Sequence, residues 1–254
     1  MMSKAFVDHF QAVTQHYLSH RPSYPAVLFD WLAQCCSQHE LAWDCGTGNG
    51  QAAVSLAPHF QRVLATDASA AQIAAATVHE RVEYRLAPAE NSGLEPASVD
   101  LLIVAQALHW FDLERFYAEA RRVLKPTGIV AVWCYGIVEL EGDAANQLLQ
   151  HFYHQVIGPY WPAEREHVET GYRQLPFPFT PIEAPAFTLQ VTWTRAQLMG
   201  YLRSWSAIGR YQAAQGVDPV LAFEQAISSA WGDAERGRLV SWPLSLRVGR
   251  ASGG

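Results

Sequence analysis

The sequence has little charge, no long apolar run and no basic cluster of the kind that binds nucleic acids. Asp, Glu, Lys and Arg together make up 17% of the 254 residues, and the formal net charge is −6. A chain that binds a nucleic-acid backbone normally carries a basic face, so we expect no such partner. Because no run of about 18 apolar residues occurs, we also expect no membrane span and a cytoplasmic protein.

Cysteine is scarce as well, and its spacing argues against two kinds of stabilisation. The four cysteines, Cys35, Cys36, Cys45 and Cys134, form no CxxC pair and have no histidine at zinc-ligand spacing. We therefore expect no metal site and no disulfide framework, and a reducing compartment fits the chain. Half of the residues are hydrophobic, so a large core can form. Because the sequence shows no basic face, a small molecule is the expected substrate. The sequence leaves open whether the chain is a monomer or a homodimer.

Strand-like and helix-like segments alternate in the middle of the chain. The expected strands read LAWDCG, RVLATDA, VEYRLA, VDLLIVAQ and GIVAVWCY, and helix-like segments separate them. VDLLIVAQ is almost continuously apolar, as expected for a strand that helices cover on both faces. The alternation predicts an α/β fold with a doubly wound, Rossmann-like parallel sheet.

The residue patterns at the two ends of the chain differ from the alternating pattern of the middle. Residues 1–40 predict an N-terminal helical cap, with one helix around Phe6 to Tyr17 and another over Val27–Cys36. Residues 41–136 form the predicted sheet core, and residues 137–254 are expected to complete it.

In that last part, PFPFTPIEAP predicts a surface excursion, and FTLQVTW and WPLSLRVGR predict two strands. Ala196 to Gly216 and Val220 to Trp231 predict two helices between these strands. We therefore expect a seven-stranded sheet with a helical insertion before its last strand.

The segment DCGTGNG, Asp44 to Gly50, is the strongest local signal, because it joins a predicted strand to a predicted helix. Glycines allow a tight turn and let the backbone approach a ligand closely, although such turns also serve simply to pack a strand against a helix. The dinucleotide fingerprint GxGxxG is not matched, since Gln51 stands at its third glycine. Asp44 would be unfavourable beside a pyrophosphate and favourable beside a cation.

Asp67 follows the second predicted strand, about twenty residues after the glycines. At that place an acid can accept hydrogen bonds from both hydroxyls of a ribose. The alternative is that Asp67 caps the following helix, but Ser69 can supply that cap and leave Asp67 for a ligand.

Together these segments resemble the class I methyltransferases that depend on S-adenosylmethionine, and within them the methyltransferase type 11 or trans-aconitate-methyltransferase-like subfamily. The resemblance spans roughly residues 10 to 135. The matching segments are YLSHRPSYP, LAWDCGTGNG, VLATDAS, APAEN, SVDLLIVAQALHWFD and EARRVLKPTGIVAVW.

This resemblance implies that the core binds S-adenosylmethionine and releases S-adenosylhomocysteine. The cofactor-binding positions that it implies are Tyr17, Arg21, Asp44, Gly46, Thr47, Gly48, Gly50, Asp67, Ala68, Ala89, Glu90, Gln106 and Ala107. Pro88 stands where the family often has an acid that contacts adenine, so a side-chain contact from that position is lost.

The acceptor pocket is expected above the carboxyl edge of the sheet. Its candidate residues are Trp110, Tyr135, Tyr201, Arg203, Trp205 and Arg210. Tyr201, Trp205 and Ile208 are predicted to share one helical face, which would also suit simple packing of the insertion. The two arginines either bind a substrate carboxylate or form surface ion pairs. His109 is the candidate catalytic base for an oxygen or nitrogen nucleophile, with a purely structural role as the alternative.

Three other functions remain open at this point. A nicotinamide-dependent oxidoreductase shares the predicted architecture. A regulatory protein that binds the cofactor without transferring its methyl group would keep the same loop. A nucleic-acid methyltransferase would need a basic groove or an NPPY-type motif, and neither occurs.

Overall fold

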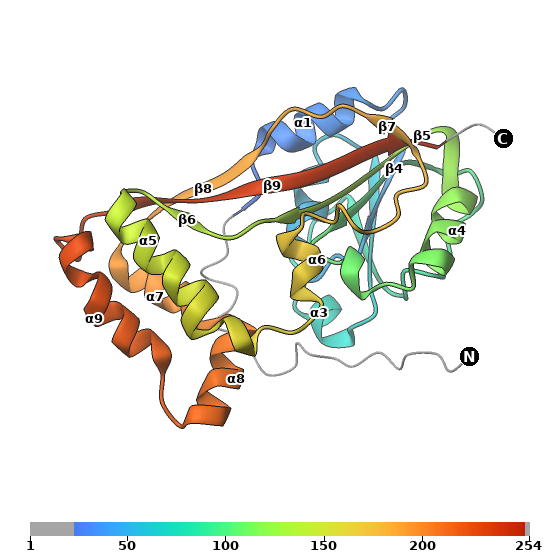
Figure 1. The fold of residues 1–254 in the computed structure, drawn as a ribbon. Coiled ribbons are helices and arrows are strands. Elements are labelled where there is room, and N and C mark those ends of the chain that lie inside the picture. Colours follow the sequence, from blue (N-terminus) through green and yellow to red (C-terminus); the bar gives the residue numbers. More distant parts are fainter. Residues whose placement is uncertain (1–22, 252–254) are drawn as a thin grey trace.

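The computed structural model describes residues 23–251. The predictions for the first helix, Tyr17 and Arg21 lie outside this range. Five parallel strands form the centre of the sheet in the order β3-β2-β1-β4-β5 (Figure 1). They are β1 (Leu41–Cys45), β2 (Arg62–Asp67), β3 (Val82–Leu86), β4 (Val99–Ala105) and β5 (Leu124–Tyr135). The predicted α/β fold and its five core strands are therefore confirmed.

Both faces of this sheet are covered because its strands are apolar on both sides. In β4, Leu102 and Val104 belong to one core cluster, whereas Leu101 and Ile103 belong to another on the opposite face. The covering helices are α1 (Ala26–Gln34), α2 (Gln51–Leu56), α3 (Ala70–Ala74) and α4 (Leu113–Val123). Strand β4 is followed by a short 3-10 turn, η1 (Leu108–Trp110).

The helix-like segment expected between the second and third core strands is helical only as far as Ala74, where α3 ends. None of its residues is buried, so packing adds nothing to extend it. The chain beyond it is held by hydrogen bonds from Thr77 N to Asn49 O and from Tyr84 Oη to Thr77 O. These bonds fix an irregular segment where the sequence indicated a helix.

The last strand, β9 (Arg238–Arg250), runs antiparallel to β5 and contacts three further strands. It pairs with β6 (Glu139–Leu140), β7 (Thr180–Ile182) and β8 (Thr188–Trp193). The described sheet thus has nine strands and not the seven predicted. β7 lies inside the proline-rich segment predicted as a surface excursion, and β6 is only two residues long.

A third core cluster lies under the C-terminal half of the chain, where the helices gather on one side of the sheet (Figure 1). The helical segments of this half of the chain are α5 (Asp143–His151), η2 (Phe152–Val156, a π-helical turn), η3 (Gly158–Tyr160), α6 (Arg165–Glu169), α7 (Arg195–Arg203), α8 (Ser206–Gln215) and α9 (Pro219–Trp231). Helices α7, α8 and α9 stand between β8 and β9, which confirms the predicted insertion.

The single helix predicted from Ala196 to Gly216 is wrong, because the chain breaks between α7 and α8. Ser204 donates both its backbone N–H and its hydroxyl to the carbonyl of Tyr201, which ends the first helix. Trp205 is extended, with φ −75° and ψ 134°, and precedes the second helix. Tyr201 and Trp205 therefore do not share one helical face, although their rings lie 5.6 Å apart.

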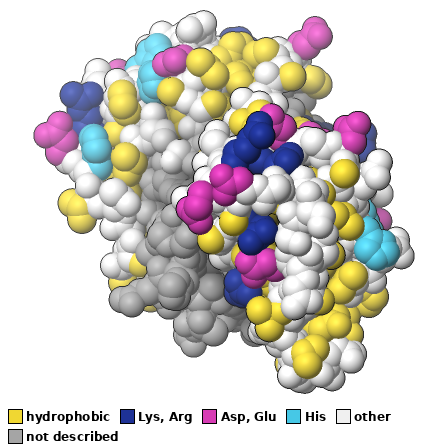
Figure 2. Space-filling model, turned by 90° about the vertical axis from the view of Figure 1, so that its left-hand side faces the viewer, with side chains coloured by type: hydrophobic (Ala, Val, Ile, Leu, Met, Phe, Trp, Pro, Cys, Tyr) yellow, Lys and Arg dark blue, Asp and Glu magenta, His cyan; other side chains and the backbone are white. Residues whose placement is uncertain are grey.

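Three further observations concern the described part of the chain alone. Its helices are all too short or too polar to cross a bilayer. It contains no group of His, Cys, Asp and Glu arranged to hold a metal ion, and its four cysteines are all unpaired. On the face shown in Figure 2, Lys and Arg side chains are interspersed with Asp and Glu.

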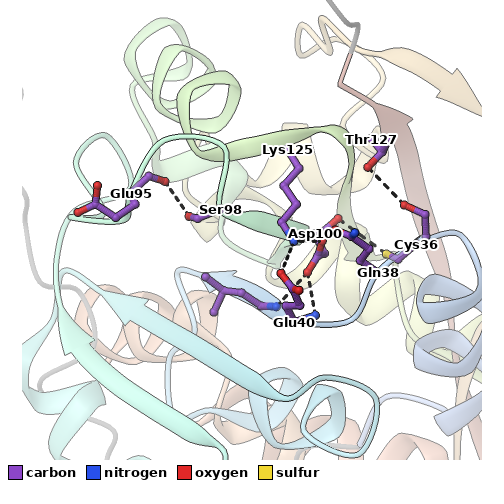
Figure 3. Close-up of polar contacts among 10 residues, drawn as sticks. Cys36, Gln38, Glu40, Glu95, Ser98, Asp100, Lys125 and Thr127 are labelled. Carbon is purple, nitrogen blue, oxygen red and sulfur yellow. Dashed lines mark hydrogen bonds and ion pairs between the residues drawn. The ribbon is translucent and has the colours of Figure 1, made fainter.

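The amino edge of the sheet is closed by a buried polar cluster around Asp100 (Figure 3). Its Oδ2 accepts hydrogen bonds from the backbone N–H of Glu40 and Leu41 at 2.8 and 3.0 Å. Its Oδ1 lies 2.8 Å from Nζ of Lys125, which also contacts the Glu40 carboxylate at 2.7 Å. Every charged group in this cluster has a partner, as a structural ion pair requires.

Candidate active site

The loop after β1 has a backbone that only glycine adopts easily. Gly46, Gly48 and Gly50 have φ values of +72°, +58° and +87°, in the left-handed region. A Cβ on Gly46 would lie 2.6 Å from Cβ of Ala107, and one on Gly50 would overlap the Tyr84 hydroxyl. The loop therefore turns tightly at the carboxyl edge of the sheet, in close contact with the segment that follows β4.

Asp67, at the end of β2, is tied to this loop. Its Oδ2 accepts the backbone N–H of Gly48 at 2.8 Å, and its Oδ1 accepts the N–H of Ser69 at 2.8 Å. Ser69 caps α3 by accepting the N–H of Gln72, as predicted. Two backbone donors thus fix the orientation of the Asp67 carboxylate at the sheet edge. The neighbouring Ala68 is exposed.

Asp44 is completely buried at the end of β1 and only partly satisfied. Its Oδ2 accepts a hydrogen bond from the Thr47 hydroxyl at 2.6 Å, whereas its Oδ1 has no partner among the described residues. Burial raises the pKa of this carboxyl to about 7, the Thr47 hydrogen bond opposes the rise, and the charge of Asp67 adds to it. A positive ligand beside Oδ1 would remove the cost of this arrangement.

The segment after β4 is strained. Gln106 has a φ of +60°, which is uncommon for a residue other than glycine, and its backbone N–H donates to Trp133 O at 2.9 Å. Its side-chain Nε2 is buried and lacks a partner within the described chain. Strain and an unsatisfied donor at one residue are typical of functional positions. Ala107, next to it, is buried against the glycine loop.

The segment after β3 is held by its acidic residue. Glu90 accepts the backbone N–H of Asp112 at 3.0 Å, and Asp112 caps α4 by accepting the N–H of Arg115. Ala89 is buried in the core cluster that contains β4. The side chain of Glu90 therefore links the loops after β3 and β4.

His109 lies in the η1 turn and contacts the buried Tyr172. Its Nδ1 is 2.8 Å from the Tyr172 hydroxyl. Burial lowers the pKa of His109 to about 3, and the charges of Arg165 and His167 lower it further. A histidine with such a pKa is neutral near pH 7 and is a weak base. Its predicted catalytic role stays a prediction, and this geometry favours the structural alternative.

The predicted acceptor residues fall into two groups. Tyr135, Tyr201 and Trp205 all pack in or against the third core cluster, under the C-terminal half of the chain, and the Tyr201 hydroxyl accepts a hydrogen bond from Trp242 Nε1 at 3.1 Å. The other group is exposed. Trp110 is 41% exposed and its ring lies 4.6 Å from that of His109.

Neither predicted arginine lies in a buried site. Arg203 forms an ion pair with Asp218 at 2.9 Å, with 40% of its side chain exposed. Arg210 is exposed on α8. The surface interpretation is the one that fits both residues.

Sequence reasoning missed Arg165, the first residue of α6. Its Nε donates to the Tyr153 hydroxyl at 2.8 Å, and its guanidinium carbon lies 4.8 Å from the centre of the Trp161 ring. In the sequence its only signal is Glu169 four residues later, which resembles an ordinary surface pair on a helix. Nothing in the sequence indicates that its charge helps to lower the pKa of His109.

An open parallel sheet with a glycine loop after β1, an acid after β2 and a strained turn after β4 defines the class I methyltransferase fold. Sequence comparison agrees with it. A family model described as a methyltransferase domain matches residues 43–132. A Dictyostelium discoideum protein provisionally named a methyltransferase is 32% identical over 229 residues, which cover 89% of this chain and 87% of that protein.

Two further similarities point the same way. A Saccharomyces cerevisiae protein provisionally named an S-adenosylmethionine-dependent methyltransferase is 32% identical over 129 residues, 47% of this chain and 44% of its own. A solved structure from Anaeromyxobacter dehalogenans, provisionally described as a type II methyltransferase, has a TM-score of 0.87 and 45% identity, covering 91% of this chain and 98% of that one. This chain belongs to the class I S-adenosylmethionine-dependent methyltransferases. Its place in the trans-aconitate-methyltransferase-like subfamily stays a prediction.

Proposed function

We propose that this methyltransferase binds S-adenosylmethionine beside the Gly46–Gly50 loop and methylates a small molecule in the cytoplasm. The observation that carries the cofactor assignment is the buried Asp44 Oδ1 without a partner in the described chain. S-adenosylmethionine carries an ammonium and a sulfonium but no phosphate. A cationic ligand compensates this carboxylate, whereas the pyrophosphate of a nicotinamide cofactor would be repelled by it.

The other residues of the core, 41–136, have separate roles in this proposal. Asp67, oriented by Gly48 N and Ser69 N, accepts hydrogen bonds from the ribose hydroxyls. Ala68 and Ala89 flank the adenine, and Gln106 and Ala107 line the methionine side. Residues 137–254 complete the sheet and cover the acceptor.

Methyl transfer requires little of the protein beyond alignment of the acceptor with the methyl carbon and the sulfur. When bound, S-adenosylmethionine supplies a methyl carbon that the acceptor's lone pair attacks while the carbon–sulfur bond breaks and its electrons stay on sulfur. Holding the acceptor in line is worth roughly 7–11 kcal/mol of the barrier. A strong base is not required, which agrees with the low pKa of His109.

A small acceptor is favoured by the aromatic side chains that gather in the C-terminal half of the chain. Tyr153, Trp161 and Trp205 have ring centroids 5.1 to 5.6 Å from one another, and Trp205 lies as close to Tyr201. Such rings enclose a compact ligand better than a polymer. The unpaired thiols favour a reducing, cytoplasmic setting.

The test is calorimetric titration of the protein with S-adenosylmethionine, S-adenosylhomocysteine and NADH. We expect saturable heat with the first two and none with NADH. Asp67→Ala should lose S-adenosylhomocysteine binding, while the control Asp218→Ala, which removes the carboxylate that caps α9, should retain it. Absence of heat with both adenosyl compounds, on folded protein, would refute the proposal. Transfer of labelled methyl to a metabolite extract then separates an enzyme from a binding protein.

A further inference from the structure

Tyr172, just beyond the end of α6, is buried in a strained backbone conformation. Its φ is +59° and that of Gly171 is +62°, and a positive φ is uncommon for a tyrosine. The neighbouring chain imposes this conformation. Tyr172 N donates to His167 O at 2.8 Å, and the side chain of Arg247, on β9, donates to Tyr172 O at 2.7 Å. Strain that several contacts enforce is concentrated at functional sites.

The hydroxyl of this tyrosine makes two hydrogen bonds with His109. Within residues 23–251, its one side-chain partner is His109 Nδ1, at 2.8 Å. Burial raises the pKa of Tyr172 well above its usual range, and a hydrogen bond from the backbone N–H of His109 opposes that rise. Because the tyrosine oxygen accepts that N–H, the hydroxyl proton is left to be donated to Nδ1. If Nδ1 carried the proton instead, the buried hydroxyl would have no acceptor in the described chain.

This hydrogen bonding decides which nitrogen of His109 is protonated. A neutral imidazole has one N–H, so a ring that accepts at Nδ1 carries its proton on Nε2. Nε2 has no hydrogen-bond partner among the described residues, and it is not sealed from solvent as the unpartnered atoms of Asp44 and Gln106 are. The ring is flanked by those of Trp110, 4.6 Å away, and Tyr172, 5.8 Å away. His109 therefore offers an oriented N–H donor that a ligand can reach.

Direct contacts bring His109 beside the glycine loop. The residues two before and two after it, Ala107 and Phe111, both lie against Gly46. A Cβ on that glycine would be 2.6 Å from Ala107 Cβ and 3.1 Å from Phe111 Cζ. His109 also follows β4, which pairs with β1 directly before the loop. Ligands of open parallel sheets bind at this carboxyl edge, so the free N–H lies on the side where a cofactor and its acceptor would meet.

We propose that Tyr172 is a positioning residue that holds His109 as the Nε2–H tautomer, and that His109 donates this hydrogen bond to an oxygen of the methyl acceptor. The inference rests on the proposed function. It gives His109 neither the role of a base nor a purely structural one. The acceptor's lone pair forms the bond to the methyl carbon, the electrons of the broken carbon–sulfur bond stay on sulfur, and His109 keeps its proton. A proton carried by the nucleophile leaves to water.

The first test identifies the tautomer by spectroscopy. Protein labelled with ¹⁵N-histidine is saturated with S-adenosylhomocysteine, and long-range proton–nitrogen spectra report which ring nitrogen is protonated. The signal that disappears in His109→Gln identifies His109. We expect one Nε2–H form between about pH 6 and pH 8 in the parent and a mixture of tautomers in Tyr172→Phe.

Tyr117→Phe is the matched control for Tyr172→Phe. It removes a tyrosine hydroxyl from the same core cluster, but that hydroxyl donates to Pro176 O at 2.7 Å. The His109 signal should be unchanged in this control. A parent ring protonated on Nδ1, or a tautomer that Tyr172→Phe leaves unchanged, would overturn the inference.

The second test separates a donor from a base by the choice of substitution. Transfer of labelled methyl from S-adenosylmethionine to a metabolite extract is measured for His109→Gln and His109→Ala. The glutamine amide donates a hydrogen bond but does not take up a proton, whereas alanine does neither. We expect His109→Gln to keep the rate within about threefold and His109→Ala to lose about tenfold or more. Equal losses would indicate a base and unchanged rates a structural role, and both results contradict the inference.

Failure of the proposed function is recognised separately. Affinity for S-adenosylhomocysteine is measured on every variant and should stay that of the parent. If the parent binds this compound but labels nothing in the extract, the acceptor part of the inference fails with the enzymatic function, and the spectra still decide the role of Tyr172. If urea denaturation shows that Tyr172→Phe does not fold, the parent spectrum and the two His109 variants decide.

Discussion

An aspartate is buried at each of the two edges of the sheet, and the hydrogen bonding of the two carboxylates differs. At the amino edge, Asp100 uses both oxygens, bonding two backbone N–H groups and Lys125. At the carboxyl edge, Asp44 uses one oxygen and leaves the other without a partner in the described chain. A buried carboxylate that is fully paired stabilises a fold, whereas one left half-paired costs stability that a ligand can restore. The comparison distinguishes structural from functional acids without reference to relatives.

The same contrast extends to other groups. In residues 23–251, the buried side-chain atoms without partners belong to Asp44, Gln106, Trp133, Trp161 and His167. Asp44, Gln106 and Trp133 lie at or near the carboxyl ends of core strands, and Trp161 and His167 lie in or next to α6. Three of the five unsatisfied groups thus lie at the edge where the cofactor is expected.

The largest effect should come from Asp67→Ala. Loss of a charged acceptor for two hydroxyls costs about 3 kcal/mol, or roughly 100-fold in affinity for S-adenosylhomocysteine. Titration calorimetry measures it. A variant that binds within threefold of the parent would place Asp67 among the structural acids.

Asp100→Ala should lower stability and leave cofactor affinity unchanged, which is the reverse of the result expected for Asp67→Ala. Two backbone N–H groups and Lys125 lose their acceptor, so the free energy of unfolding should fall by about 3 kcal/mol. Urea denaturation measures the loss, and Asp30→Ala, an exposed acid 3.6 Å from His59, serves as the control with a small effect. Affinity of the folded variant for S-adenosylhomocysteine should not change. A loss of affinity comparable to that of Asp67→Ala would contradict the assignment of Asp100 as a purely structural acid.

Asp44→Asn should change the pH dependence of binding. The pKa of this carboxyl is raised to about 7 in the ligand-free protein, so the proton must leave before the carboxylate can meet the ligand's ammonium. Affinity for S-adenosylhomocysteine should therefore rise by up to roughly tenfold between about pH 6 and pH 8. Without ligand the sign is reversed: the native state holds the proton more tightly than the unfolded state, so Asp44 makes stability fall as pH rises towards 7.

The Asp44→Asn variant should lose both the pH dependence of affinity and the pH dependence of stability, because asparagine does not titrate. Calorimetry and urea titration at several pH values test the two parts independently. An undiminished pH dependence of affinity in Asp44→Asn would assign it to another group.

The smallest effect is expected for Arg203→Gln. Its ion pair with Asp218 is solvent-exposed, so the free energy of unfolding should fall by about 0.5 kcal/mol and the affinity for S-adenosylhomocysteine should be unchanged. Urea denaturation and titration calorimetry measure the two quantities. A tenfold loss of affinity would place Arg203 among the residues that hold the cofactor.

The sequence was informative where local chemistry decides the structure. Continuous apolar runs predicted β1 and β4 because helices cover both of their faces. The glycine loop and the caps at Ser69 and Asp112 follow from backbone requirements that only a few residue types meet.

The sequence was less informative where tertiary contacts decide the structure. β6 and β7 are two and three residues long and exist because β9 lies beside them. Helix α6 has five residues, too few for an apolar period to show. The position of Arg165 depends on Tyr153, twelve residues earlier in another helical turn, which no spacing rule connects to it.

Strand β9 makes the completion of this fold a late event on the ribosome. It is synthesised after every other strand of the described sheet, yet β5, β6, β7 and β8 all pair with it. Until it emerges, β5 has an open edge that another chain can occupy, and the three shorter strands lack their ladder. A nascent chain can therefore form its parallel core early but must await residue 250 before the C-terminal half of the sheet is complete.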